Sequence, residues 1–458
     1  MEVVEKTLQQ VLKDRLKSFD ADERRRALIE LVRIGKSIHK SSENVNMHLH
    51  SFFSYNAENW SPTRIAWECA QKGLYAAGIV DFDVLDGQEE FIQVGELLGL
   101  RTSVGLETRA FLTEYLDKVI DSPGEPGVSY ILAGGFVKEL ANDSPQAKTL
   151  ASYKETSTNR NLALIDRINP HVPDIAIDYS IDVLPLTPSG NATERHIISA
   201  YVSKAQQAFP DAQVLKNFWA ELLNKTANEM DDLLKNRAAL EELVRAKFAK
   251  RGGFGYVQPT SETFPKVEEF FQWAQQCGAI PMESWLDGTS EGESDGKALL
   301  ECSKAKGACA LNLIPDRNWN ISNPETKAMK MANLKDIINI ANSMDMPIHI
   351  GTEMNKAGLP FVDDLNGAAL KPFKETIIKG ASIFIGHAVL ARYADFFYAG
   401  QKAQEMFGSS VKNKNDFFSA VGVLPPLSSN TAYKLKEYGE EKAFTEINDA
   451  LKKGKWSK

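Results

Sequence analysis

The sequence predicts an α/β protein centred on a distorted barrel of seven or eight β/α units, with helical extensions at both ends and a helical insertion. Two observations favour this fold class. From residue 45 onward, short runs of β-branched and small apolar residues alternate with helical patterns, which is typical of β/α units around a parallel sheet. Between residues 188 and 251 the strand-like runs stop and helical patterns remain. We therefore expect five segments: a helical arm (1–44), a first part of the barrel (45–187), the helical insertion (188–251), a second part of the barrel (252–395) and a helical extension (396–458).

The arm shows apolar residues at helical spacing, with a break near residues 19–22 where an aspartate can cap a second helix. The first β/α unit follows it. Residues 45–50 alternate between two faces, so that Asn46, His48 and His50 share one of them. The next helix should begin at Ser61-Pro62, a cap residue followed by a proline, and end near Gly73.

Eight further runs are strand candidates, which together with residues 45–50 are enough to close a barrel. They are Ala76–Val80, Thr102–Leu106, Tyr130–Ala133, Ile181–Leu186, Ala279–Met282, Ala308–Leu313, Pro347–Gly351 and Ser382–Gly386.

Acidic residues and a histidine follow several of these runs. In parallel barrels the loops after the strands gather at one mouth, where active sites lie, so these side chains should converge. They are Asp81, Asp83, Glu107, Glu283, Asp287, Asp316, Glu353 and His387.

Composition narrows the classes of function. A net charge of −8 gives no general attraction to nucleic acids or anionic membranes, so a phosphorylated ligand would need local cations. The four cysteines show no zinc spacing and suggest no secreted disulfide framework. The charged first 26 residues lack the apolar core of a signal peptide, and no apolar stretch is long enough to span a bilayer. We expect a cytoplasmic protein that binds neither nucleic acid nor membrane.

The pair His48 and His50 is the strongest local sign of chemistry, because two imidazoles on one strand face can reach one metal ion. A solvated strand face is the alternative. Residues 48–111 combine this pair with a helix introduced by Ser61-Pro62, a strand ending in Asp81-Phe82-Asp83 and a strand ending in Gly105-Leu106-Glu107. This stretch resembles the opening of the polymerase and histidinol phosphatase (PHP) domain, and residues 310–320 and 347–355 are similar to its later strands more weakly.

The resemblance implies a distorted TIM-like barrel of PHP type that binds up to three zinc, iron or manganese ions at its mouth and hydrolyses phosphate esters. His48, His50 and Glu107 match family ligands, and Glu353 takes the place of a late aspartate. Other ligands are missing. Phe82 replaces a histidine, Asn355 replaces another, and two further histidines are absent near residues 134–136 and 281–284.

We therefore expect one divalent transition metal ion (Zn, Fe or Mn), held by His48, His50, Glu107 and Glu353. Further ligands or catalytic groups are expected among Asp81, Asp83, Asn355 and His387. Arg109 is the first candidate cation for transition-state charge, with Arg317 and Lys356 after it.

The predicted function is a metal-dependent hydrolase, a phosphoesterase that attacks a small phosphorylated substrate through a metal-bound hydroxide. Two alternatives remain open. One is a catalytically degenerate PHP barrel that binds a ligand or a protein partner, which the missing imidazoles favour. The other is metal-assisted chemistry on a sugar or sugar acid, because barrels host many reactions.

Overall fold

The structure is a computed structural model, and it describes residues 2–35, 42–260 and 262–457. The chain divides into two compact units. The barrel unit comprises the described residues of 1–51, 56–148 and 260–458. The helical unit comprises Phe52–Tyr55 and Thr149–Pro259, so it is larger than the insertion expected at 188–251.

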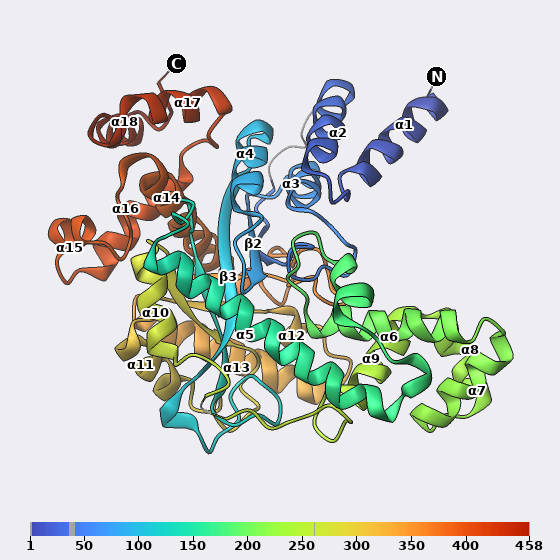
Figure 1. The fold of residues 1–458 in the computed structure, drawn as a ribbon. Coiled ribbons are helices and arrows are strands. Elements are labelled where there is room, and N and C mark those ends of the chain that lie inside the picture. The colour runs from blue at the N-terminus through green and yellow to red at the C-terminus, as the bar shows by residue number, and fades with distance from the viewer. Residues whose placement is uncertain (1, 36–41, 261, 458) are drawn as a thin grey trace. The chain divides into compact units, whose positions relative to one another are not determined.

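A seven-stranded sheet forms the centre of the barrel unit, and its strands are adjacent in chain order. Figure 1 labels two of these neighbours, β2 and β3. Most of its residues are buried, as expected of strands covered on both faces. The sheet is mixed, because β4 runs antiparallel to both of its neighbours while the other pairs are parallel. The strands are β1 (Val45–Leu49), β2 (Ala76–Phe82), β3 (Arg101–Phe111), β4 (Val128–Gly134), β5 (Ile280–Trp285), β6 (Ala310–Leu313) and β7 (Ile348–Ile350).

The sheet closes almost completely into a barrel. A parallel bridge joins Leu49, at the end of β1, to Glu353, just after β7. The amide of His50 donates to the carbonyl of Glu353, and the amide of Glu353 donates to the carbonyl of His48, both at 2.8 Å. These two bonds bring the first and last strands of the sheet together.

Two of the expected strands are wrong. Ile181–Leu186 lies in two short helical turns, η4 (Tyr179–Val183) and η5 (Leu184–Leu186). Ser382–Gly386 lies in the long helix α14 (Lys374–Ala394) and is buried throughout. An apolar run of five residues occurs equally in a buried helix, and here the helix formed. The expected parallel direction is also wrong for β4, although its position was predicted.

Helices surround the barrel strands. Ser61 caps α3 as predicted, since its side chain accepts from the amide of Arg64 and Pro62 is the first helical residue. Helix α14 packs against α16 and also contacts β1, β2, β3 and β7. The helices around the strands are α3 (Pro62–Gln71), α4 (Gln88–Leu98), α10 (Val267–Gln276), α11 (Gly296–Lys306), α12 (Asp316–Trp319), α13 (Pro324–Ser343) and α14, with short turns η1 (Thr113–Tyr115) and η6 (Lys371–Phe373).

Among the described residues, helices precede β1 and follow α14. The N-terminal arm holds α1 (Glu2–Arg15) and α2 (Ala21–Ile34), the second capped by Asp20, while residues 1 and 36–41 of the expected arm lie outside the described residues. The C-terminal extension holds α15 (Gln401–Phe407), α16 (Val411–Val423), α17 (Ser429–Tyr438) and α18 (Glu440–Lys453).

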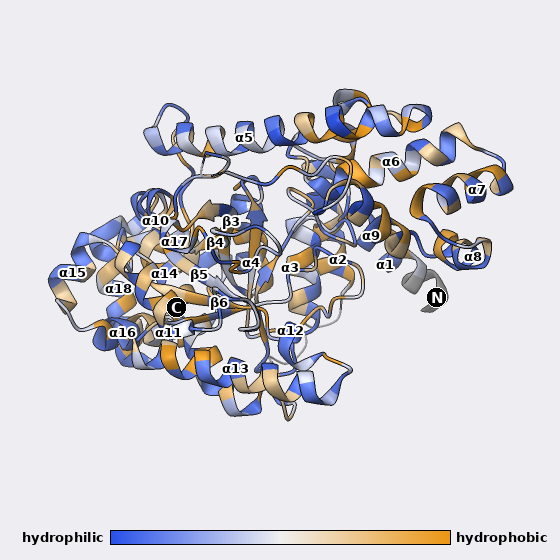
Figure 2. Cartoon of the chain, turned by 90° about the horizontal axis from the view of Figure 1, so that it is seen from below, coloured by the Kyte–Doolittle hydropathy of each residue, from blue (hydrophilic) through white to orange (hydrophobic). Residues whose placement is uncertain are grey.

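The helical unit has its own apolar core, built around fully buried Trp219, Tyr201 and Phe248. At the start of α6, Glu194 pairs with Arg245 at 2.5 Å and with Lys250 at 3.0 Å. In Figure 2 most of α5 is hydrophilic, and its buried residues lie in its last turns. The helices are α5 (Pro145–Ile168, starting in the barrel unit), α6 (Glu194–Ala208), α7 (Ala212–Leu223), α8 (Ala227–Lys235) and α9 (Arg237–Phe248), with turns η2 (Asn169–His171) and η3 (Pro173–Ile175) besides η4 and η5.

No helix among the described residues combines the length and the apolar character needed to cross a bilayer.

Candidate metal centre

His48 lies near the end of β1, His50 directly follows that strand, and Glu107 lies on β3 two strands away. Between them, β2 pairs Phe82 with Glu107 in register. Because β1, β2 and β3 are parallel, their carboxyl ends lie at the same mouth of the barrel. Gly351 allows the chain after β7 to pass close to β1, since a Cβ at this position would collide with His48. The local fold therefore brings three distant side chains to one point.

The three ligand atoms form a compact, buried group. The Oε2 atom of Glu107 lies 3.4 Å from Nε2 of His48 and 3.2 Å from Nε2 of His50. All three atoms lie within 4.8 Å of one another, and each of the three residues is at most 3% exposed. Among the described residues this is the one group of three or more such side chains close enough to share a metal ion.

Asn312, on β6, orients the His48 ring. Its Oδ1 lies 3.3 Å from Nδ1 of His48 and 2.9 Å from Nδ1 of His349, and its Nδ2 donates to Ser284 at 3.4 Å. An amide oxygen only accepts hydrogen bonds, so both imidazoles donate from Nδ1. With the ring proton on Nδ1, the Nε2 lone pair of an unprotonated His48 faces the carboxylate of Glu107, 3.4 Å away.

This arrangement places two acceptors face to face in a buried position. Neither Nε2 of His48 nor Oε2 of Glu107 makes a hydrogen bond to a described residue. Unsatisfied buried acceptors are costly unless a cation lies between them, either a proton or a metal ion. Two imidazoles and a carboxylate are the donors that zinc, iron and manganese accept, so the residues fit a metal ion of this class.

Electrostatics favour the charged forms of Glu107 and His50. Burial would raise the pKa of Glu107, but the neighbouring imidazoles of His48 and His50 outweigh it and hold the pKa at about 2. Burial would lower the pKa of His50, yet Glu107, Asp81 and Glu353 raise it above its ordinary value. Glu107 is thus ionised and ready to bind a cation at neutral pH.

Asp81 and Asp83 lie near the centre but are engaged by neighbouring residues. The carboxylate of Asp81 accepts from the amide of Ser51 at 2.7 Å and from its hydroxyl at 2.6 Å. Asp83 adopts a left-handed backbone with φ of 57° and accepts from Thr108 at 2.6 Å. Both are buried, and Asp81 acts on His50 through its charge.

Glu353 lies next to the centre through its backbone, while its side chain pairs with Arg317. Oε2 of Glu353 lies 2.8 Å from the Arg317 guanidinium, and it is not part of the compact ligand group. Glu353 and Met354 both have positive φ, of 62° and 55°, a conformation that is uncommon outside glycine. The Arg317 side chain is 42% exposed, and the charges of Glu353, Asp316 and Glu107 all raise its pKa.

Arg109 and His387 are not brought to the ligand group. Arg109 pairs with Glu125 at 3.3 Å and lies over the ring of Phe264. His387 was expected at the end of a strand, and it is instead fully buried in α14. Its Nε2 donates to the carbonyl of Gly135 at 3.0 Å and its Nδ1 accepts from the amide of Tyr398 at 3.2 Å. These backbone bonds explain the presence of this histidine without a role in chemistry.

Phe82 occupies the position where the resemblance implies a histidine. Its ring stacks on His50, with centroids 4.8 Å apart and planes 17° apart, and its edge meets Tyr130. Phe82 therefore forms an apolar wall beside His50.

Asn312 and His349 are the residues near the centre that sequence reasoning missed or set aside. His349 was expected to face a neighbouring element, and it does contact Asn312 on β6. A lone asparagine between two leucines in a buried strand was the available signal for Asn312, because a buried amide needs partners.

No family model and no curated protein sequence matches the chain. Solved structures that are similar to part of it include the following two. A candidate metal-dependent phosphoesterase from Bifidobacterium adolescentis is 17% identical, with a TM-score of 0.46, over 74% of this chain and 98% of that one. An amidohydrolase from Chromobacterium violaceum, with bound sulfate and no metal, is 14% identical, with a TM-score of 0.48, over 74% of this chain and 96% of that one. Both scores are below 0.5, so the likeness to the PHP family rests on the sequence motifs.

Proposed function

We propose that this protein is a metal-dependent hydrolase of PHP type that cleaves a phosphate ester of a small substrate, using one divalent transition metal ion. The observation that carries the proposal is the pair of buried acceptors, Nε2 of His48 and Oε2 of Glu107, 3.4 Å apart with His50 beside them. Such a pair calls for a cation.

His48, His50 and Glu107 would hold the metal ion. A bound ion of this class makes a water molecule acidic enough to act as a nucleophile near neutral pH. Asn312 keeps the His48 ring in the required tautomer, and the Asp81 charge beside His50 favours cation binding. Three protein ligands leave coordination positions open, which is the arrangement of catalytic rather than structural sites.

Arg317 is the proposed binding group for the substrate phosphate. Its guanidinium is held by Glu353, which the bridge to Leu49 fixes beside β1, and it is partly exposed. A guanidinium has five N–H donors, so the bond to Glu353 leaves others for an anion. We assign Arg317 this role in preference to Arg109, which Glu125 and Phe264 occupy.

Metal content and turnover of the full chain test the proposal. Purified protein should hold about one zinc, iron or manganese ion and hydrolyse at least one member of a panel of phosphomonoesters and diesters. His48→Ala should lose both the ion and turnover, whereas His171→Ala, which alters an exposed histidine of the helical unit, should keep both. Hydrolysis that persists after complete metal removal would overturn the proposal.

One observation favours a second candidate function, a barrel that binds a ligand without turnover. The stacked Phe82 ring removes an imidazole from the mouth, and with it a possible second metal ion. This function predicts protein that carries no stoichiometric metal and whose melting temperature does not change when Zn²⁺ or Mn²⁺ is added.

A further inference from the structure

A pocket separate from the metal centre lies at the opposite end of β3 from Glu107. Its walls come from residues 101–104 of β3, the end of α4, the middle of α14 and the segment 421–427 that links α16 to α17. None of the ligand residues of the metal centre lines it. Glu107 follows Arg101 by six residues, which is about 20 Å along a strand. The two sites are therefore distinct.

Most of the pocket surface is apolar. About 590 Å³ of space lies between its lining atoms, with the open mouth and the solvent in it included. Its apolar lining includes Ile92, Phe136, Ile385, Val389, Leu424 and Trp456.

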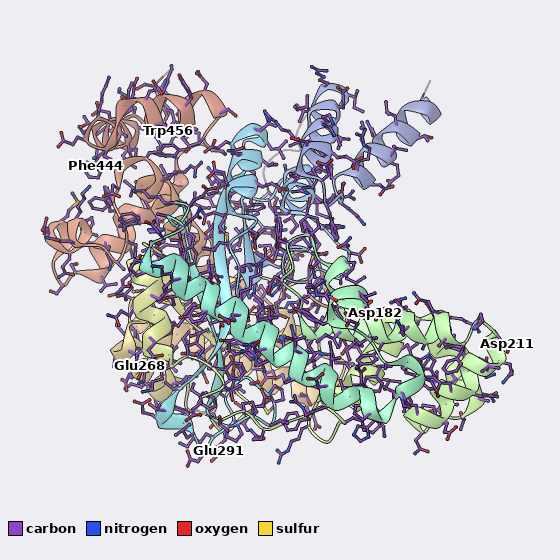
Figure 3. The ribbon with its side chains drawn as sticks, in the orientation of Figure 1. Asp182, Asp211, Glu268, Glu291, Phe444 and Trp456 are labelled. Carbon is purple, nitrogen blue, oxygen red and sulfur yellow. The ribbon has the colours of Figure 1, made fainter. Side chains whose placement is uncertain are left out.

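The C-terminal tail completes one wall. Nε1 of Trp456 donates to the carbonyl of Pro425 at 2.7 Å, which ties the residues after α18 to the segment 421–427. Figure 3 labels Trp456 in this region. The C-terminal extension thus has a defined part in shaping the pocket.

Arg101 gives the pocket a positive charge. Among the residues that the structure describes, no carboxylate forms an ion pair with it. Its guanidinium donates to the carbonyls of Gly422, Val423 and Leu424, and more weakly to that of Tyr75. These bonds use four of its five N–H groups. The other charges of the pocket pair with one another, since Arg392 binds Glu89 and approaches Glu96, which also accepts from Tyr393.

Ser103 lies two residues after Arg101, so both project from the same face of β3. Ser103 is 3% exposed and lines the pocket, so its hydroxyl can reach a ligand there. Arg101 and Ser103 together offer a cation and a donor beside an apolar chamber.

We propose that this pocket binds a small carboxylate that carries an apolar tail. The carboxylate would accept from the remaining Arg101 N–H and from the Ser103 hydroxyl, and the tail would occupy the apolar space bounded by α14 and the segment 421–427. The charge selects an anion, and the apolar walls exclude a fully polar one such as inorganic phosphate.

Isothermal titration calorimetry of the full chain with octanoate tests this site. Octanoate should bind with one-to-one stoichiometry, and octanol, which has the same tail without the charge, should bind at least about tenfold more weakly. Arg101→Met should lower the affinity for octanoate by about tenfold or more, and it should leave the affinity for octanol unchanged. Equal affinity for octanoate and octanol would overturn the proposal.

A second pair of variants covers the case in which Arg101→Met does not fold. Ala388 lines the pocket, so Ala388→Trp should fill it and abolish octanoate binding, whereas Ala399→Trp, at an exposed position outside the lining, should bind normally. His48→Ala should bind octanoate as the wild type does. Loss of octanoate binding in His48→Ala would place the carboxylate at the metal centre and overturn the proposal. Normal octanoate binding by Ala388→Trp would also overturn it.

Discussion

The ring of Phe82 stacks on the imidazole of His50, with centroids 4.8 Å apart and planes 17° apart. Asp81 and Asp83 flank this ring in the sequence, and both carboxylates are buried near it. The position thus retains the acidic neighbours of a metal site while its central side chain cannot bind metal.

Restoring an imidazole at this position should create a second metal site. Phe82→His places a nitrogen donor beside His50, with Asp81 and Asp83 as adjacent carboxylates, so we expect the metal content to rise from about one ion toward two. Metal analysis after dialysis against Mn²⁺ measures the number of ions bound per chain. Phe82→Leu is the control and should stay near one ion, and equal contents in the two variants would contradict the prediction.

Removing the acceptor that orients His48 should weaken the metal site without unfolding the barrel. Asn312→Leu deletes the oxygen that both His48 and His349 use, and such supporting contacts are typically worth about 10- to 100-fold in metal affinity. Competition with a fluorescent chelator measures the affinity. Asn312→Asp keeps an acceptor in place and should retain most of the metal affinity. Unchanged affinity in Asn312→Leu would show that the ring is held by other contacts.

Arg317 should affect substrate binding rather than metal binding. Arg317→Met removes the cation paired with Glu353, and we expect KM for a phosphorylated substrate to rise by about tenfold or more while the metal content stays the same. Arg317→Lys keeps the charge and should show a smaller rise. Loss of the metal ion in Arg317→Met would assign the residue to the structure of the centre instead.

His387 should contribute to stability and not to catalysis. His387→Leu removes the bonds to Gly135 and Tyr398 and leaves two buried backbone groups unpaired, which should lower the free energy of unfolding by about 1–3 kcal/mol per group. Thermal denaturation measures the loss, and metal content and turnover below the melting temperature should be unchanged. A large fall in kcat in the folded variant would restore the catalytic role expected from the sequence.

Glu194 should make the helical unit sensitive to acid. Burial opposes its ionisation, but Lys250 and Arg245 hold its pKa at about 2 in the folded state, whereas an unfolded glutamate titrates near 4.3. Because the folded pKa is the lower one, the stabilisation is present above about pH 4.3 and is lost as the pH falls toward 2. Glu194→Gln should therefore be less stable than wild type by about 1–3 kcal/mol at pH 7, with the difference shrinking below pH 4. A difference that is constant with pH would contradict this.

Much of the barrel could be predicted because apolar runs mark its strands. Residues 45–50 and the strands that contain Asp81 and Glu107 were placed within a few residues of their observed positions, and these strands carry His48, His50 and Glu107. The direction of β4 could not be predicted, since side-chain alternation is the same in parallel and antiparallel strands. Most residues of α14 are buried, so its sequence lacks the polar stripe that distinguishes a helix, and Ser382–Gly386 resembled a strand.

The interactions of the site could be predicted less well than its location. Strand ends indicated which residues gather at the mouth, but they gave no partners, so Glu353 was expected as a ligand although its carboxylate pairs with Arg317. Asn312 carries no charge and belongs to no metal-binding pattern, and its role depends on β6 lying close to both His48 and His349. Contacts between distant strands of this kind require the folded backbone.

The bridge between Leu49 and Glu353 has a consequence for the order in which the protein forms during synthesis. His48, His50 and Glu107 emerge from the ribosome early, yet the backbone that pairs with His48 and His50 is made some 300 residues later. A nascent chain that ends before Glu353 leaves one side of β1 without its hydrogen bonds, an edge that invites pairing with other chains. Completion of the carboxyl-terminal half therefore protects the segment that bears the histidines.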